Sequence, residues 1–160
     1  MTPGPAYTFG TELPVDVGAA RERVVAALAA EGFGVLTEID VAAVMKAKLE
    51  IDSSPYLILG ACNPLLAHRA LGAEPSIGAL LPCNVVLRAA GNGTLVEVMD
   101  PEAIMGITSA PEIEKVAAEA SERLRRAVEA LAPLEEDGQQ SRSRGSGQDR
   151  TNAPDDEEVP

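Results

Sequence analysis

Aromatic side chains are scarce in this chain: among 160 residues there are two tyrosines, two phenylalanines and no tryptophan. Positive charge is also scarce, because 13 lysines and arginines stand against 25 aspartates and glutamates and leave a net charge of −12. Proteins that bind nucleic acid use basic side chains for the phosphates and aromatic ones for stacking on bases, and this chain has few of either. We therefore expect no nucleic-acid partner.

Long hydrophobic runs are missing from the sequence as well. No stretch reaches the ~18 apolar residues of a membrane-spanning helix, and residues 1–10 contain neither a basic residue nor the apolar run of a signal peptide. We expect a cytoplasmic protein with no membrane partner. In that compartment the two cysteines, Cys62 and Cys83, are expected to be reduced thiols rather than a disulfide.

The composition changes near Pro133, and this change divides the chain in two. Residues 135–160 contain 8 acidic and 3 basic residues and almost no apolar ones, so they cannot bury enough surface to offset the entropy lost on ordering. We predict a single domain over residues 1–134, with a net charge of −7, followed by a disordered acidic tail over 135–160. A domain of that size forms one core without a structural cofactor, and none is predicted.

Apolar periodicity and turn residues predict alternating strands and helices in the domain. Strands are expected at 7–13, 33–39, 56–61, 85–90 and 94–99, and helices at 16–31, 41–49, 64–71 and 109–131. Glycine and asparagine adopt positive φ at little cost, so Gly91-Asn92-Gly93 predicts a hairpin between the last two strands. The last helix is the longest and needs an apolar surface beneath it, which this hairpin offers. The pattern predicts an α+β fold with a mostly antiparallel sheet and helices packed on one side.

The second predicted helix has its apolar residues at helical spacing. We expect this face to point into the core: Val41, Val44, Met45 and Leu49. Two helix starts are also marked by residue type, since Asp16 and Asn63 are favoured N-cap residues and Pro64 occupies the first position of the third helix. The longest helix is expected to begin with a capping box formed by Ser109 and Glu112.

Several separate segments, taken in order and spacing, resemble one known family. They are Glu31-Gly32-Phe33-Gly34-Val35, Lys46-Ala47-Lys48-Leu49, Ala61-Cys62-Asn63-Pro64, Ala67 to Leu71, Gly78 with Leu80 to Val86, and Asp100-Pro101. Over roughly residues 7–131 the chain resembles the family called domain of unknown function 302. The resemblance implies a compact α+β domain with a curved, mostly antiparallel sheet of about five strands and a long C-terminal helix, commonly a homodimer in the bacterial cytoplasm. It implies no reaction.

Five residues at predicted strand ends form the candidate site. Cys62-Asn63 leaves the third strand, Cys83-Asn84 enters the fourth, and Asp100 follows the fifth. If these ends converge, a few polar groups meet beside an apolar core, which is how small-ligand sites are usually built. The alternative is local, because asparagine and aspartate commonly cap helices and start turns, and free cysteines commonly fill space in a core.

A complete catalytic or metal-binding set is not visible in the sequence. Cys62 and Cys83 are 21 positions apart rather than in a Cys-x-x-Cys motif, and with the single histidine, His68, they provide only three zinc ligands. No metal site is predicted. A reactive thiol at Cys62 remains an alternative. The dipole of a helix that begins at Pro64 would lower the pKa of Cys62 and favour its thiolate.

These observations leave three functional hypotheses. The first is a homodimeric binding or accessory domain with a small-ligand pocket at Cys62, Asn63, Cys83, Asn84 and Asp100. The second is a thiol redox enzyme or sensor in which Cys62 reacts and Cys83 resolves. The third is a structural interaction protein that acts through its dimer and its acidic tail.

Overall fold

A computed structural model of the chain describes residues 1, 4–105, 108 and 110–131. Its elements, in chain order, are β1 (Thr8–Leu13), α1 (Val17–Ala30), β2 (Gly34–Asp40), α2 (Val41–Leu49), β3 (Tyr56–Cys62), α3 (Pro64–Ala73), the 3-10 helix η1 (Pro75–Leu80), β4 (Cys83–Ala90), β5 (Gly93–Met99), α4 (Pro101–Met105) and α5 (Pro111–Glu129). The predicted acidic tail, residues 135–160, lies outside the described residues. The five-residue helix α4 is not predicted from the sequence, because it is too short to show a periodic pattern.

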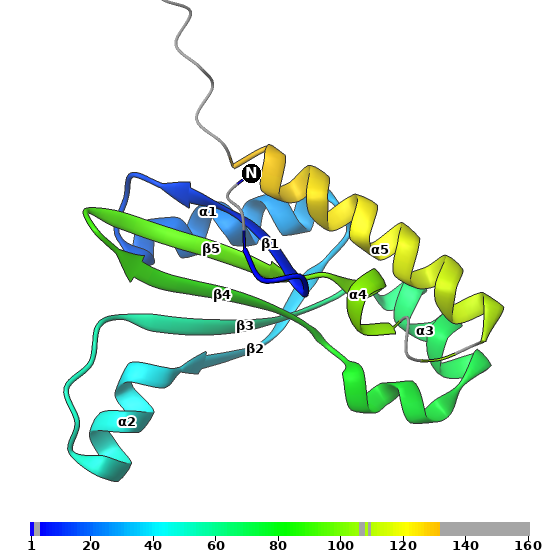
Figure 1. Ribbon diagram of the computed structural model, residues 1–160, viewed down its shortest axis with the longest axis horizontal. Coiled ribbons are helices and arrows are strands. Elements are labelled where there is room, and N and C mark those ends of the chain that lie inside the picture. Colours follow the sequence, from blue (N-terminus) through cyan, green and yellow to red (C-terminus); the bar gives the residue numbers. More distant parts are fainter. Residues whose placement is uncertain (2–3, 106–107, 109, 132–160) are drawn as a thin grey trace, which may run out of the picture.

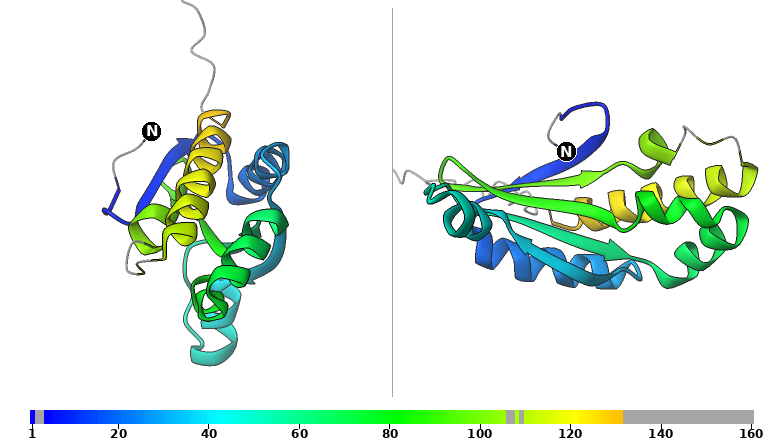
Figure 2. Two further views of the ribbon diagram at one scale, coloured as in Figure 1. Left: turned by 90° about the vertical axis from the view of Figure 1, so that its right-hand side faces the viewer. Right: turned by 90° about the horizontal axis from the view of Figure 1, so that it is seen from below.

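The five strands form one antiparallel sheet in the order β1-β5-β4-β3-β2 (Figure 1). Helices α1 and α5 contact each other and cover one face of this sheet, and α3 packs against α5 beyond the end of β3 (Figure 2). The predicted α+β fold is therefore confirmed, with its antiparallel sheet of five strands, helices on one side and a long C-terminal helix.

The core lies between the sheet and the two covering helices. Alternate residues of each strand point toward the helices, which is why Leu59, Val85, Leu87, Val96 and Val98 are almost fully buried. The apolar faces of the two helices complete the core with Ala20, Val24 and Leu28 from α1 and with Ile113, Leu124 and Val128 from α5. The longest helix lies on this sheet but contacts mainly its strand β1, whereas α1 lies over the hairpin strands β4 and β5, which the sequence predicts beneath α5.

Helix starts follow the sequence in some places and not in others. The Asp16 carboxylate accepts a hydrogen bond from the Ala19 amide at 3.0 Å and caps α1, as its residue type predicts. Helix α5 begins at Pro111, and its N-cap residue, Ala110, makes no side-chain bond. The predicted cap, Ser109, lies outside the described residues. Pro111 at the first helical position has no N–H group, so α5 begins with one fewer unpaired donor that a cap would have to satisfy.

The outward orientation of α2 contradicts the sequence-based expectation. None of its residues is buried, and Val44 and Leu49 are 45 % and 60 % exposed. The helix lies past the end of the sheet, contacts mainly β3 and projects from the domain (Figure 1). Its apolar residues do share one helical face, but within the described residues no element packs on that face.

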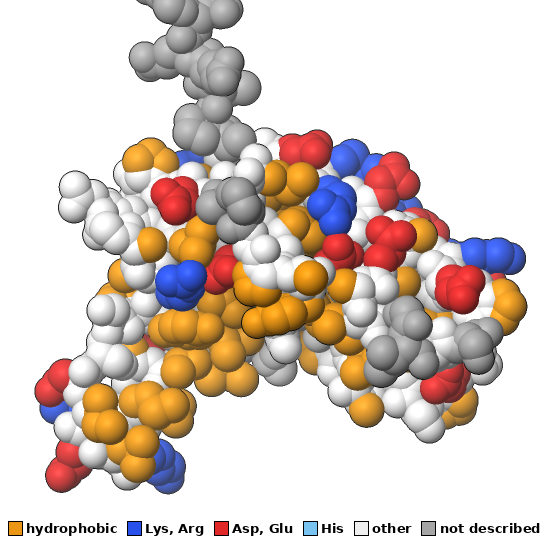
Figure 3. All heavy atoms as spheres, in the orientation of Figure 1, with side chains coloured by type: hydrophobic (Ala, Val, Ile, Leu, Met, Phe, Trp, Pro, Cys, Tyr) orange, Lys and Arg blue, Asp and Glu red, His pale blue; other side chains and the backbone are white. Residues whose placement is uncertain are grey.

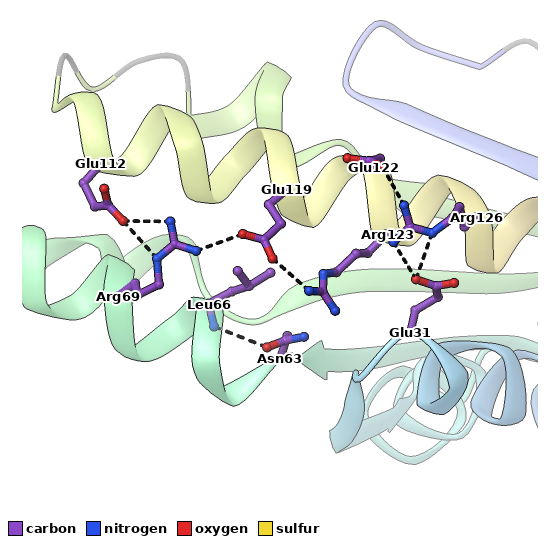
Figure 4. Close-up of polar contacts among 9 residues, drawn as sticks. All are labelled: Glu31, Asn63, Leu66, Arg69, Glu112, Glu119, Glu122, Arg123 and Arg126. Carbon is purple, nitrogen blue, oxygen red and sulfur yellow. Dashed lines mark hydrogen bonds and ion pairs between the residues drawn. The ribbon is translucent and has the colours of Figure 1, made fainter.

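Charged side chains connect α5 to the neighbouring helices on the outer surface (Figure 4). Arg69 of α3 donates hydrogen bonds to Glu112 and Glu119 of α5 at 2.9 and 2.8 Å. Further along α5, Arg126 donates to Glu31, which follows α1, at 2.9 Å. These ion pairs are largely exposed to solvent, which screens them, so each contributes little to stability. Their main effect is to fix how α5 lies across α1 and α3.

Candidate functional site

The two cysteines stand at the same end of the sheet. Strands β3 and β4 run antiparallel with Ala61 paired to Cys83, so β3 finishes at Cys62 beside the place where β4 begins. Cys83 is buried and Cys62 is half-buried. The strand register therefore makes these two strand ends neighbours, which is the condition on which the candidate site depends.

A small apolar cavity lies between these strand ends and the helices. Cys62, Asn63 and Cys83 line it, together with apolar side chains that include Phe33, Leu66 and Met105. Its volume is ≈ 20 Å³, which is room for about one water molecule. Pockets that hold small organic ligands measure about 300–1,000 Å³. In this structure the cavity is thus too small for such a ligand, which would require it to open.

Asn63 lines the cavity, but its side chain serves mainly as the N-cap of α3. Its side-chain oxygen accepts a hydrogen bond from the Leu66 amide at 3.2 Å (Figure 4), and the residue is buried. Its amide nitrogen lies so close to Gly32 that a β-carbon there would come within 3.0 Å of it. The side chain is therefore held by local structure, which is the alternative that the sequence left open for this residue.

Two of the five candidate residues are not among the residues that line the cavity. Asn84 is exposed, because it lies on the face of β4 opposite its buried neighbours Cys83 and Val85. Asp100 follows β5 and is turned toward α5. The structure brings together three of the predicted site residues, and it leaves these two elsewhere.

Asp100 forms a polar cluster of its own. Its carboxylate accepts hydrogen bonds from the Ser121 hydroxyl at 2.9 Å and from the Arg125 guanidinium at 2.7 Å. Ser121 is fully buried, the Asp100 side chain is 14 % exposed, and the Arg125 guanidinium carbon lies 4.2 Å from the centre of the Phe9 ring. This arrangement ties the end of β5 to α5 and to β1, so Asp100 has a structural role in the described part of the chain.

His68 is exposed on α3 and is not among the residues that line the cavity beside the two thiols. Within residues 4–105, 108 and 110–131, no three histidine, cysteine, aspartate or glutamate side chains gather as a set of metal ligands. In the same residues no helix is long and apolar enough to cross a membrane.

The face of the sheet opposite the helices carries a row of apolar side chains that the sequence pattern does not single out. Ile39 pairs with Ile58, and Ile58 pairs with Val86, so the three side chains cross β2, β3 and β4 side by side. Val86 lies between the buried residues Val85 and Leu87, and Ile58 precedes the buried Leu59, so these two side chains point away from the helices. Ile39 lies on the same face because it pairs with Ile58. Tyr56 and Leu95 extend the row on either side of Arg88. We call these five apolar residues the open face.

Residues 40–55, which comprise α2 and the loop that follows it, form an arm beside the open face. Val44, Met45, Leu49 and Ile51 of the arm are exposed, as are Leu36 and Ile39 of the adjoining strand β2. Figure 3 shows hydrophobic side chains over β3 and β4 and on α2. One sequence signal points to this region: Thr37 and Glu38 put polar groups on both faces of β2, which is typical of an edge strand.

Comparisons with known proteins agree with this fold. The family described as Domain of unknown function DUF302 matches residues 9–131. The chain belongs to the DUF302 family. A crystal structure of an uncharacterised conserved DUF302 protein from Bacillus stearothermophilus is similar to this chain, with a TM-score of 0.74 and 27 % sequence identity over 79 % of this chain and 99 % of that chain. No curated protein matches the sequence.

In this DUF302 domain the environment of both thiols favours the protonated form. Burial, and to a smaller extent the neighbouring Cys62, raises the pKa of the Cys83 thiol to about 11. Burial also raises the pKa of Cys62. From the sequence we expect the α3 dipole to lower the Cys62 pKa, but this pKa is raised, because burial removes water from the thiolate. At neutral pH the thiols of this DUF302 domain are therefore weak nucleophiles.

We predict that iodoacetamide modifies the native DUF302 domain slowly at pH 7.5. Cys62 should react more slowly than free cysteine, and Cys83 should react only after denaturation, because the thiolate is the reacting species and burial suppresses it. Raising the pH to 9.5 should speed the reaction at Cys62. Mass spectrometry of the protein at timed intervals counts the adducts, with the denatured chain as the control that takes two. Rapid double labelling of the native protein at pH 7.5 would contradict this prediction.

Proposed function

We propose that this DUF302 domain is a cytoplasmic homodimeric binding or accessory module, which recognises a partner surface and does not transform a substrate. The exposed apolar surface of the arm and adjoining β2 supports the proposal. Six large apolar side chains there are between 37 % and 66 % exposed: Leu36, Ile39, Val44, Met45, Leu49 and Ile51. Together they expose on the order of 600 Å² of apolar surface, as much as the largest patch of a typical monomeric protein, with Leu36 on the helix side of β2 and Ile39 on the opposite face.

The small-ligand part of the sequence-based hypothesis rests on the cavity beside Cys62, Asn63 and Cys83. Three residues of the expected site line it, which is in favour of a ligand there. Its small volume is against one, unless α3 or α5 moves away from the sheet. We therefore place recognition at the apolar surface first and at the cavity second.

The thiol redox alternative has one observation in its favour, since Cys62 and Cys83 line the same cavity. The raised pKa values of both thiols weigh against it. For the third hypothesis, the acidic tail 135–160 supplies charge but lies outside the described residues. Deleting residues 135–160 separates it from the first: binding at the cavity or at the apolar surface should survive the deletion, whereas docking through the tail should be lost.

Native mass spectrometry of the freshly purified full chain, repeated after denaturation without reductant, tests the proposal. We expect a dimer of about twice the 16.6 kDa chain mass in the native spectrum, with both thiols reduced in the denatured one. A monomer at a protein concentration of tens of micromolar would overturn the proposal. Extra mass that disappears on denaturation would reveal a bound ligand, and a chain two hydrogens lighter would show a Cys62–Cys83 disulfide and support the redox alternative.

A further inference from the structure

We propose that two copies of this chain dimerise by exchanging arms, so that α2 of each copy lies on the open face of the other. This inference rests on the homodimer proposed above and adds which surfaces meet. Three properties of these surfaces support it: the missing support of α2, the size of the apolar area and the placement of charge.

Helix α2 lacks the packing that a helix of its length needs. It has nine residues, and isolated helices shorter than ~12–15 residues are marginal in water. In proteins such a helix is stabilised by burying an apolar face. The apolar face of α2 exists, with Val44, Met45 and Leu49 at helical spacing, but none of these residues is buried within the described chain. A surface outside the described residues is needed to cover it, and residues 135–160 contain almost no apolar side chains that could supply one.

The open face is a surface of the matching kind. Ile39, Ile58 and Val86 form a row across three strands, and none of them is buried. Helices commonly pack on the apolar face of a sheet, so the open face can receive an amphipathic helix.

The exposed apolar area is close to what a stable dimer uses. A standard-size interface takes about 800 Å² from each partner. The arm and adjoining β2 expose on the order of 600 Å², and the half-buried residues of the open face, including Ile58 and Val86, bring the total near that value. Neither surface alone provides the area that one partner contributes to a standard-size interface. This favours an interface that uses the arm and the open face together.

The charges of the domain restrict where a second copy can bind. The first 134 residues carry −7, so two copies repel except where they meet through uncharged surface. The ionised pair nearest the centre of the open face, Arg88 and Glu97, is joined at 3.0 Å and neutralises itself, and on the arm Lys46 is paired with Asp52 at 2.8 Å. The remaining charges, on Lys48 and Glu50 of the arm and on Glu12 opposite Leu95, are exposed and must stay at the rim of the interface if the two surfaces are to meet without burying a net charge.

A two-fold dimer would cover both kinds of surface at once. In such a dimer the same patch is used on both copies, and each contact between patches occurs twice. The projecting helix and the uncovered sheet face belong to the same chain, so one rotation axis covers both arms and both open faces. A different partner would need to present a matching helix and a matching sheet face together.

Two variants test the exchange. Val44→Glu puts a carboxylate on the arm, and Ile58→Lys puts an ammonium group on the open face. Each side chain would be buried unpaired in the proposed dimer, and each variant alone should weaken dimerisation by on the order of 100-fold or more, as measured by sedimentation equilibrium. Leu65→Glu on α3 is the matched control, because Leu65 is 78 % exposed and α3 lies far from the arm (Figure 1), and it should leave the dimer unchanged.

Mixing the two variants gives the decisive measurement. In a mixed dimer one contact is between an unaltered arm and an unaltered open face. The other contact places the introduced carboxylate beside the introduced ammonium group, so the mixture should regain dimer that neither variant forms alone. Circular dichroism of each variant checks that it remains folded. A Val44→Glu chain that stays dimeric, or a mixture without mixed dimer, would overturn arm exchange but leave the homodimer standing. A wild-type chain that is monomeric would overturn both.

Discussion

Replacing Asp100 with alanine is expected to lower the free energy of unfolding by about 2–3 kcal/mol. The carboxylate accepts from the Ser121 hydroxyl and from Arg125, and Ser121 is fully buried. Without it, a buried hydroxyl and a partly buried guanidinium lose their partner, and unpaired groups of this kind cost about 1–3 kcal/mol or more. The loss should appear as a lower midpoint of urea unfolding, at one fixed protein concentration because dimerisation contributes to stability.

Glu122→Ala is the matched control for Asp100→Ala. Glu122 also pairs with an arginine, Arg126, at 2.6 Å, but its side chain is 74 % exposed. Exposed pairs contribute little, so this variant should change stability by no more than about 0.5 kcal/mol. Equal effects of the two variants would contradict the structural role of Asp100. If Asp100→Ala kept its stability but lost a bound ligand, the result would support the ligand-binding role that the sequence suggests for Asp100.

Replacing Gly10 with alanine is expected to cost about 3 kcal/mol and to lower the melting temperature by roughly 10 °C. Gly10 lies in β1 opposite Glu97, and a β-carbon there would collide with the carbonyl oxygen of Val96 in the neighbouring strand. Because the obstacle is backbone and not the end of a flexible side chain, β1 must shift away from β5 to relieve the clash. Thermal unfolding followed by circular dichroism measures the effect.

Gly34→Ala provides a matched strand glycine. A β-carbon at Gly34, in β2, would meet no heavy atom within 4 Å. Alanine restricts the unfolded chain more than glycine does, so this variant should be neutral or stabilise the domain by about 0.5 kcal/mol. Equal melting temperatures for Gly10→Ala and Gly34→Ala would show that β1 and β5 do not approach each other as closely at Gly10 as the structure indicates.

Membership of the DUF302 family gives this chain a fold but no reaction. Its function must therefore be inferred from the surfaces and cavities of the chain itself. The thiols, which are the most reactive groups at the predicted site, have raised pKa values, whereas the exposed apolar arm has no role within the described chain. Both observations favour recognition over chemistry, and the proposed mass spectrometry and mixing experiments test it directly.

The sequence by itself determined the parts of the fold that depend on neighbouring residues. Strand and helix periodicity, the N-cap residues Asp16 and Asn63, and the hairpin at Gly91-Asn92-Gly93 all act within a few positions along the chain. Such local preferences place the five strands and the main helices, and the long apolar face of α5 requires a sheet beneath it. The family resemblance rests on several short segments of the same local kind, and it was confirmed.

Only the tertiary structure decided which residues meet. Cys62 and Asn84 follow the same strand-end pattern in sequence, yet one lines the cavity and the other points to the opposite face, because strand register and side-chain alternation set the direction of each side chain. Helical spacing shows that α2 has an apolar face but not what that face contacts. The direction of that face depends on where β2 and β3 end, and this position places the arm beyond the core of its own chain.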